Sequence, residues 1–251
     1  MKLILLLFPI LCLSQTIKVN YTFTTSSYQK QETLIADSNS SYYYNEPYEG
    51  SNTAKDKVEG TEVTLVQKDI KLNKIEFYQN RESQIIFYQL KYKGEKRLIT
   101  DSVPNINWII NKKDLKKING YVCNRATTHF RGRDYEAWFT PEIPVTFGPF
   151  KFKGLPGLIL ISNSIGDNSK KSWVATNIAT LDKLFQIPKI CEDCINMTLK
   201  EFIEYKQNLR EEASKASTAR LPKGYSNVKT SFKRLSIETV YEWETEDEEK
   251  K

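Results

Sequence analysis

Apolar and polar residues alternate with a period of two along much of the chain. Over residues 16–24 apolar side chains occupy every second position, from Ile17 to Phe23, with polar ones between them. Segments with the same character follow at residues 84–92 and 121–130. Such alternation is typical of strands buried on one face only, and it favours antiparallel pairing over a parallel sheet covered on both faces.

One segment has the period of a helix instead. Thr198 and Glu201 form the Thr-x-x-Glu pattern of a capping box, and Leu199 and Phe202 begin an apolar face. These signals predict a helix at about residues 198–217. The expected fold class is therefore mainly β (β-rich α+β), an antiparallel curved or half-barrel-like sheet with one main helix near the C-terminus.

The first fourteen residues have the features of a secretory signal. Lys2 is followed by an apolar run, and the small residues Cys12 and Ser14 precede the expected cleavage point. The run is too short to cross a bilayer, so no transmembrane span is expected. We predict an exported protein that is periplasmic, outer-membrane-associated or secreted. The expected division is a signal peptide (1–14), a single β-rich domain (15–240) and an acidic C-terminal tail (241–251).

Charge and cysteine content exclude several classes of function. The 37 Lys and Arg residues outnumber the 31 Asp and Glu residues only slightly, and they form no basic stripe of the kind that binds nucleic acid. With a single histidine and no ligand spacing, we expect neither a metal site nor a cofactor. Export permits one disulfide among the three cysteines after the leader: Cys191 with Cys194, or one of them with Cys123.

The strongest local motif covers residues 148–160. Phe150 and Phe152 alternate with Lys151 and Lys153, and Leu-Pro-Gly-Leu at residues 155–158 suits a type II turn. A hairpin packed into the core accounts for these residues.

This motif carries a family resemblance. The run Gly-Leu-Pro-Gly-Leu-Ile at residues 154–159 resembles the GLPGLI family, exported proteins of Bacteroidetes-type bacteria, and so do the blocks at residues 120–126, 131–140 and 142–144. The similarity extends over roughly residues 16–180. It implies a signal peptide and residence in the cell envelope, and it brings no assigned reaction, substrate or cofactor.

A thiol-protease pair of Cys123 and His129 is not expected, and we assign no catalytic residue. On one strand, these two residues share a face but lie about 20 Å apart at ~3.3 Å per residue. A nucleophile and its base need hydrogen-bond contact.

Three carboxylates offer an alternative, an exported hydrolase that uses Asp134, Glu136 or Glu142, with Arg133 holding an anionic group. Charge pairing on an exposed sheet explains the same residues. The two interpretations differ in whether the carboxylates converge in a concave pocket or spread over an exposed face.

Aromatic residues beside an arginine give the best material for a ligand surface. The candidate ligand-binding residues are Arg133, Tyr135, Trp138, Phe150 and Phe152. The leading hypothesis is a non-enzymatic envelope protein that binds a partner protein or an apolar ligand. A structural or assembly factor of the envelope is a further alternative, for which a flat, exposed aromatic patch would be the sign.

Overall fold

The structure is a computed structural model. It describes residues 15–52, 68–83, 85–166, 170–182, 186, 188–189, 191–218 and 236–244. The predicted signal peptide, residues 1–14, and most of the predicted acidic tail, residues 245–251, lie outside the described residues.

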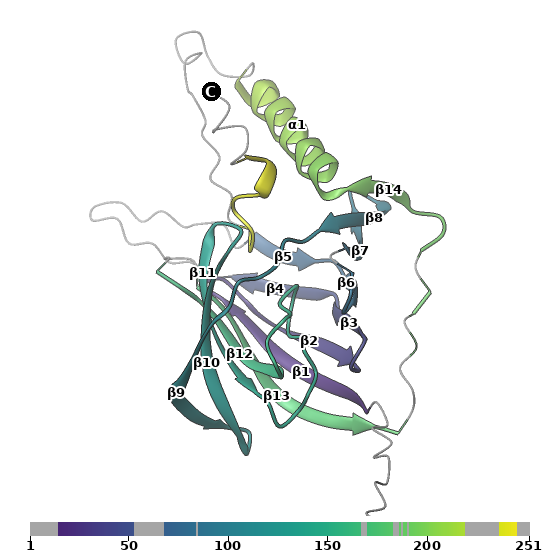
Figure 1. The fold of residues 1–251 in the computed structure, drawn as a ribbon. Coiled ribbons are helices and arrows are strands. Elements are labelled where there is room, and N and C mark those ends of the chain that lie inside the picture. The colour runs from purple at the N-terminus through teal and green to yellow at the C-terminus, as the bar shows by residue number, and fades with distance from the viewer. Residues whose placement is uncertain are drawn as a thin grey trace, which may run out of the picture.

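Twelve strands form one strongly curved sheet (Figure 1) in the order β14-β8-β7-β6-β3-β2-β1-β13-β12-β11-β10-β9. Every neighbouring pair is antiparallel except β14 and β8, which are parallel. Two further strands, β4 and β5, pair with each other. The fold class predicted from the sequence is confirmed: a mainly β, mostly antiparallel open sheet with one main helix.

The strand bounds follow the alternation of the sequence closely. In chain order, the first six strands of the large sheet are β1 (Thr16–Thr25), β2 (Gln29–Ala36), β3 (Ser40–Asn45), β6 (Ile75–Asn80), β7 (Ile85–Tyr92) and β8 (Glu95–Ser102). The next six along the chain are β9 (Ile109–Ile118), β10 (Tyr121–Phe130), β11 (Arg133–Thr140), β12 (Leu158–Ile165), β13 (Lys171–Leu181) and β14 (Ile195–Thr198). The small sheet is formed by β4 (Tyr48–Asn52) and β5 (Lys68–Leu72).

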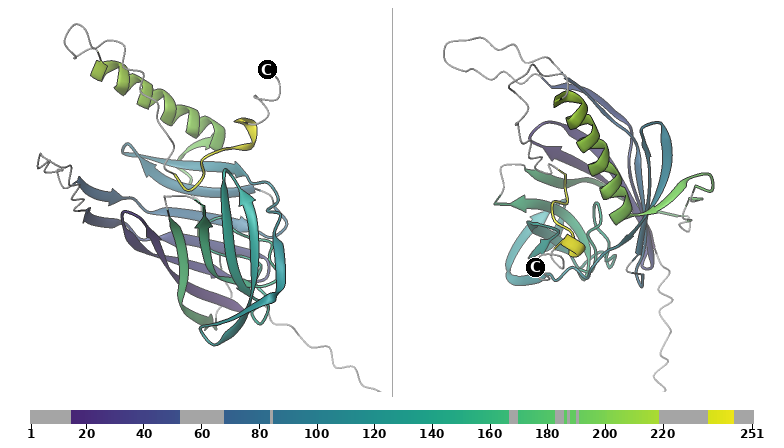
Figure 2. Two further views of the ribbon diagram at one scale, coloured as in Figure 1. Left: turned by 90° about the vertical axis from the view of Figure 1, so that its left-hand side faces the viewer. Right: turned by 90° about the horizontal axis from the view of Figure 1, so that it is seen from above.

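Residues 141–157 connect β11 to β12, and most of residues 145–152 are buried on the concave side of the large sheet. Phe150 contacts Phe77 of β6, and Phe152 contacts Tyr135 of β11, with ring centroids 5.5 and 4.8 Å apart. Strands this far apart in the sheet order can contact one short segment because the sheet is curved. Figure 2 shows this curvature of the sheet from two sides. The curvature therefore makes this connection part of the hydrophobic core.

The turn in this connection differs from the predicted type II turn. The backbone N–H of Gly157 donates to the carbonyl of Leu155, which closes a three-residue turn around Pro156. A Cβ atom on Gly157 would lie 2.1 Å from the carbonyl oxygen of Thr140, so only glycine fits this close backbone approach. The motif is thus explained by packing of backbone against backbone, in addition to turn geometry.

Helix α1 (Leu199–Thr218) confirms the helix expected at about residues 198–217. The capping box is formed: Glu201 N–H donates to the Thr198 hydroxyl at 3.2 Å, and the Glu201 carboxylate accepts from Thr198 N–H at 2.7 Å. Phe202 packs edge-on against Tyr92 of β7, which holds the helix at the end of the sheet where β14 lies. None of the helices in the described part of the chain is long and apolar enough to cross a membrane.

Candidate functional site

The five candidate ligand-binding residues do not form one surface. Tyr135, Phe150 and Phe152 are buried in the core, and Phe150 stacks on Trp173 with ring centroids 6.0 Å apart. These rings fill the interior, where Phe152 packs edge-to-face with both Tyr135 and Phe150. They therefore form packed core in this structure.

Trp138 lies on the opposite face of β11 from Tyr135. Its indole N–H donates to the Glu136 carboxylate at 3.0 Å, and the Lys116 ammonium lies 5.6 Å from its ring centroid. From Arg133 to Trp138, positions of odd number on β11 are buried and positions of even number lie on the other face, so one groove cannot contain both aromatic groups.

The three carboxylates of the hydrolase hypothesis each have a different partner. Asp134 pairs with His129 at 2.7 Å, and Glu136 accepts from Arg125 Nε at 2.6 Å. Glu142 accepts from the backbone N–H of Val122 at 2.7 Å and is exposed. This is the spread-out arrangement, in which no two of the three share a partner among these contacts.

Cys123 and His129 lie on opposite faces of β10, contrary to the same-face expectation. Cys123 is fully buried, whereas the His129 side chain is two-thirds exposed. The alternation shifts by one between Cys123 and Ala126, where the pairing with β9 is irregular. Burial, together with the negative charge of Glu142, raises the pKa of the Cys123 thiol to about 11, which keeps it protonated and unreactive at neutral pH.

The two cysteines that precede β14 form a disulfide. The sulfur atoms of Cys191 and Cys194 lie 2.10 Å apart, and Cys123 is a free thiol. Among the described residues, no group of three or more His, Cys, Asp or Glu side chains is placed to hold a metal ion.

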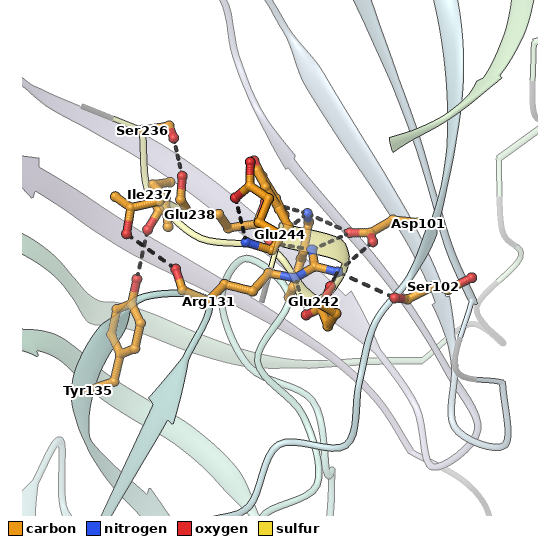
Figure 3. A network of polar contacts seen from close by, with 12 residues as sticks. Asp101, Ser102, Arg131, Tyr135, Ser236, Ile237, Glu238, Glu242 and Glu244 are labelled. Atoms are coloured by element: carbon orange, nitrogen blue, oxygen red, sulfur yellow. Dashed lines mark hydrogen bonds and ion pairs between the residues drawn. The ribbon is translucent and has the colours of Figure 1, made fainter. Parts of the chain in front are cut away.

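A buried group of charged side chains forms the best-defined polar site in the described structure (Figure 3). It brings together the end of β8, the turn between β10 and β11, the connection from β11 to β12, and residues 236–244, which we call the C-terminal strap. We refer to it as the Arg131 cluster, which consists of Asp101, Arg131, Lys151, Glu238 and Glu242.

Arg131 is the centre of this cluster. Its two terminal nitrogens donate to both oxygens of Asp101, at 2.9 and 2.8 Å. One of them also donates to Glu238 at 2.6 Å, and Nε donates to Glu242 at 2.9 Å. Lys151 Nζ completes the cluster by donating to Asp101 at 2.7 Å and to both oxygens of Glu238 at 2.9 and 2.8 Å.

Burial and pairing have opposite effects on the ionisation of the cluster. Burial favours the neutral form of Asp101, but the charges and hydrogen bonds of Lys151 and Arg131 outweigh it and lower the pKa of the carboxyl below its ordinary value. Burial likewise opposes the charge on Arg131, yet Asp101 and Glu238 raise the pKa of the guanidinium. Asp101 and Arg131 are therefore both charged at neutral pH and joined by charge-assisted hydrogen bonds.

The neighbouring residues of β11 bind the strap by its backbone. Arg133 donates from Nε to the carbonyl of Ile237 and from a terminal nitrogen to the carbonyl of Ser236, both at 2.9 Å. The Tyr135 hydroxyl donates to the same Ile237 carbonyl at 3.2 Å. Arg133 and Tyr135, predicted to contact a ligand, thus hold a segment of the chain itself. Figure 3 shows Tyr135 pointing to Ile237 of this segment.

The predicted boundary between the domain and an acidic tail, after residue 240, falls inside the strap. Tyr241 is buried and Glu242 pairs with Arg131, so both belong to the folded domain. The two terminal nitrogens of Arg131 donate to Asp101, which leaves Nε to donate to the carboxylate of Glu242.

Sequence reasoning missed Lys151, Asp101 and Glu238. Lys151 was assigned to the side opposite the two phenylalanines, but Phe150 has a φ of 59°, which breaks the alternation and turns Lys151 inward. A signal was present for Asp101: it follows Ile99 at the inward spacing of β8. A charged residue at a buried position needs a partner, and that need could have directed the search.

The comparisons with known proteins agree with the fold and leave the activity open. Residues 130–161, which include Arg131, Arg133 and Lys151, match a family described as "Protein of unknown function (Porph_ging)". No curated protein matches the sequence.

Two solved structures of PNGF-II have a similar fold. The structure in space group P21 has 15% sequence identity and a TM-score of 0.54 over 76% of this chain and 33% of that chain. The structure in space group C2 has 16% identity and a TM-score of 0.50 over 76% of this chain and 32% of that chain. The present chain thus spans about a third of the length of PNGF-II, and at this identity the likeness concerns the fold alone.

Proposed function

We propose that this chain is an exported cell-envelope protein of the GLPGLI family that acts by binding a polypeptide partner and has no catalytic activity of its own. The signal-like residues 1–14 support export. The family match at residues 130–161 contains the Gly-Leu-Pro-Gly-Leu-Ile run and supports the family assignment.

One observation carries the proposal: the best-defined polar site binds a peptide segment in the way a peptide ligand is bound. Arg133 donates hydrogen bonds to two successive backbone carbonyls of the strap, and Arg131 donates to two of its carboxylates. Recognition of both backbone and side chains is characteristic of peptide binding. Planar arginine donors suit such paired contacts.

The rival hypotheses have less support in the geometry. A hydrolase needs its carboxylates on either side of one bond, whereas Asp134, Glu136 and Glu142 face three different partners. An apolar ligand needs an open aromatic groove, whereas Phe150 and Phe152 are packed against core residues. A structural factor would be expected to have a flat, exposed aromatic patch. Trp138 does not form such a patch, because the Lys116 ammonium lies over its ring.

The experiment is a peptide-display selection on the purified mature protein. Peptides retained by the wild type are counter-selected against Arg133→Lys, which keeps the charge but cannot donate to two carbonyls as the guanidinium does. Arg125→Lys on the outer face is the matched control. We expect a set of peptides that bind the wild type and the control and lose at least about tenfold in affinity with Arg133→Lys, because a charge-assisted contact is lost.

Two outcomes would overturn the proposal. One is the absence of any peptide that discriminates between the two arginine variants. The other is hydrolysis of glycan or ester substrates that disappears when Glu136 or Glu142 is replaced by glutamine.

A further inference from the structure

The C-terminal strap contacts the domain as a bound ligand does. It contains no strand of the sheet, and in the described structure its backbone–backbone hydrogen bonds to the domain are made at a turn: Thr239 and Val240 N–H both donate to the carbonyl of Arg131, at 3.0 and 3.3 Å. Val240 is 40% exposed and the Glu242 side chain 36%. The strap contributes Tyr241 to the core, with Ile237 and Trp243 packed against it, but none of these residues belongs to a strand, so local opening of the strap would break no strand pairing of the sheet.

The charges of the site require an acidic occupant. The cations Arg131 and Lys151 are almost completely buried, and the domain itself supplies Asp101 as their carboxylate. The strap adds Glu238 and Glu242. Without these two groups the buried cations would outnumber the buried carboxylates of the cluster, which is costly at low dielectric.

The turn between β10 and β11 is shaped for the close approach of a peptide. Gly132 has a φ of 80°, and a Cβ atom there would lie 2.4 Å from the Thr239 hydroxyl and 2.8 Å from a methyl of Val240. Gly120 occupies the same place in the turn between β9 and β10, with a φ of 89°, and a Cβ atom there would meet nothing within 4 Å. The two turns share a backbone conformation, but of the two only the turn between β10 and β11 has the strap packed against it.

From these observations we infer that the partner polypeptide binds in place of the strap, and that it is an acidic segment with carboxylates spaced like Glu238 and Glu242. This inference rests on the proposed function and names its ligand class and its regulation. Because the strap is tethered, its high effective concentration lowers the apparent affinity of a competing segment. The strap is thus an internal competitor that sets the affinity for the partner.

The test uses the full-length mature protein, labelled with ¹⁵N, and an unlabelled peptide with the sequence of residues 236–244. Amide hydrogen exchange is measured at Thr239 and Val240, whose hydrogen bonds to Arg131 break when the strap leaves. At saturating peptide we expect their exchange to accelerate at least about tenfold, with the amides between β1 and β13 unchanged. The control is the same peptide with glutamine at both glutamate positions.

A second measurement covers the affinity. A fluorescent form of the peptide should bind Glu238→Gln protein at least about tenfold more tightly than wild type, because the variant strap competes less well. Glu211→Gln in α1 is the matched control. If the Glu238→Gln protein does not fold, the exchange experiment on the wild type still tests whether the peptide displaces the strap.

The outcomes separate this inference from the proposed function. Unchanged exchange at Thr239 and Val240, or equal acceleration by the glutamine peptide, overturns the inference. If display peptides still require Arg133 in that case, the proposed function stands, with the partner bound on a surface that the strap completes. If no peptide requires Arg133, the proposed function fails whatever the strap peptide does.

Discussion

Arg125 and Arg131 lie on the same stretch of chain and each contacts two or more carboxylates, yet they belong to different environments. The Arg125 side chain is 35% exposed and pairs with Glu136 and Asp114 on the outer face. The Arg131 side chain is 1% exposed and pairs with Asp101, Glu238 and Glu242. Water and salt screen the first group, whereas the second depends on its partners alone to offset desolvation.

This comparison teaches that a count of ion pairs says little about which of them matter. On the outer face, loss of a partner exposes a charge to water, which solvates it. In the Arg131 cluster, loss of a partner leaves a charge where solvent is absent. Burial therefore decides the importance of each pair, and the two regions can be tested against each other.

The largest effect is expected from Arg131→Met compared with Arg125→Met. Loss of Arg131 leaves Asp101 and Glu238 buried with Lys151 as their remaining cation in the cluster, and should lower the free energy of unfolding by about 3–5 kcal/mol. Arg125→Met should leave the urea midpoint close to that of the wild type. Urea denaturation followed by tryptophan fluorescence measures both, and equal losses would contradict the comparison.

A smaller effect is expected from acid. Asp101 has a lowered pKa in the folded protein, so its stabilising contribution is complete above the unfolded value near 3.9 and is lost as the pH falls through the lower folded value. Burial alone would raise the pKa of Asp101, but the charges and hydrogen bonds of Lys151 and Arg131 lower it. Asp101→Asn should therefore cost about 1.5–3 kcal/mol at pH 7.

The difference between wild type and Asp101→Asn should narrow as the pH is lowered from 5 toward 2, measured by urea unfolding at each pH. Asp134→Asn on the outer face is the control for the loss of a carboxylate. A difference that stays constant with pH would show that Asp101 acts by packing and not by its charge.

The smallest expected effect is a difference in stability between glycine substitutions in the two turns that flank β10. Gly120→Ala and Gly132→Ala both introduce a Cβ atom at positive φ, so both have the same backbone strain. Gly132→Ala additionally collides with Thr239 and Val240 and should cost about 1–2 kcal/mol more. Thermal unfolding measures the difference, and equal costs would show that the strap does not press on this turn.

The sequence predicts much of the fold because the relevant information is local. The period of two marks β1 and β10 to within a residue, and Thr198 with Glu201 marks the start of α1. The same local rule would have separated Trp138 from Tyr135, since they lie at positions of opposite parity on one strand. Combining them into one ligand surface overlooked this alternation.

The Arg131 cluster could not be predicted because its contacts are distant in sequence. Arg131 and Glu238 are 107 positions apart, and no periodicity connects them. The inward direction of Lys151 depends on the left-handed backbone of Phe150, which local propensity disfavours for an aromatic residue. In that conformation Phe150 stacks on Trp173, and such packing between distant residues is not visible in a pattern of single residues.

The order in which the cluster residues occur along the chain has a consequence for biosynthesis. Asp101, Arg131 and Lys151 emerge from the ribosome well before Glu238. Until residues 236–244 have been synthesised, Arg131 and Lys151 have Asp101 as their carboxylate within the cluster. The cluster is therefore completed late in folding, after the segments that form β1 to β14 have left the ribosome.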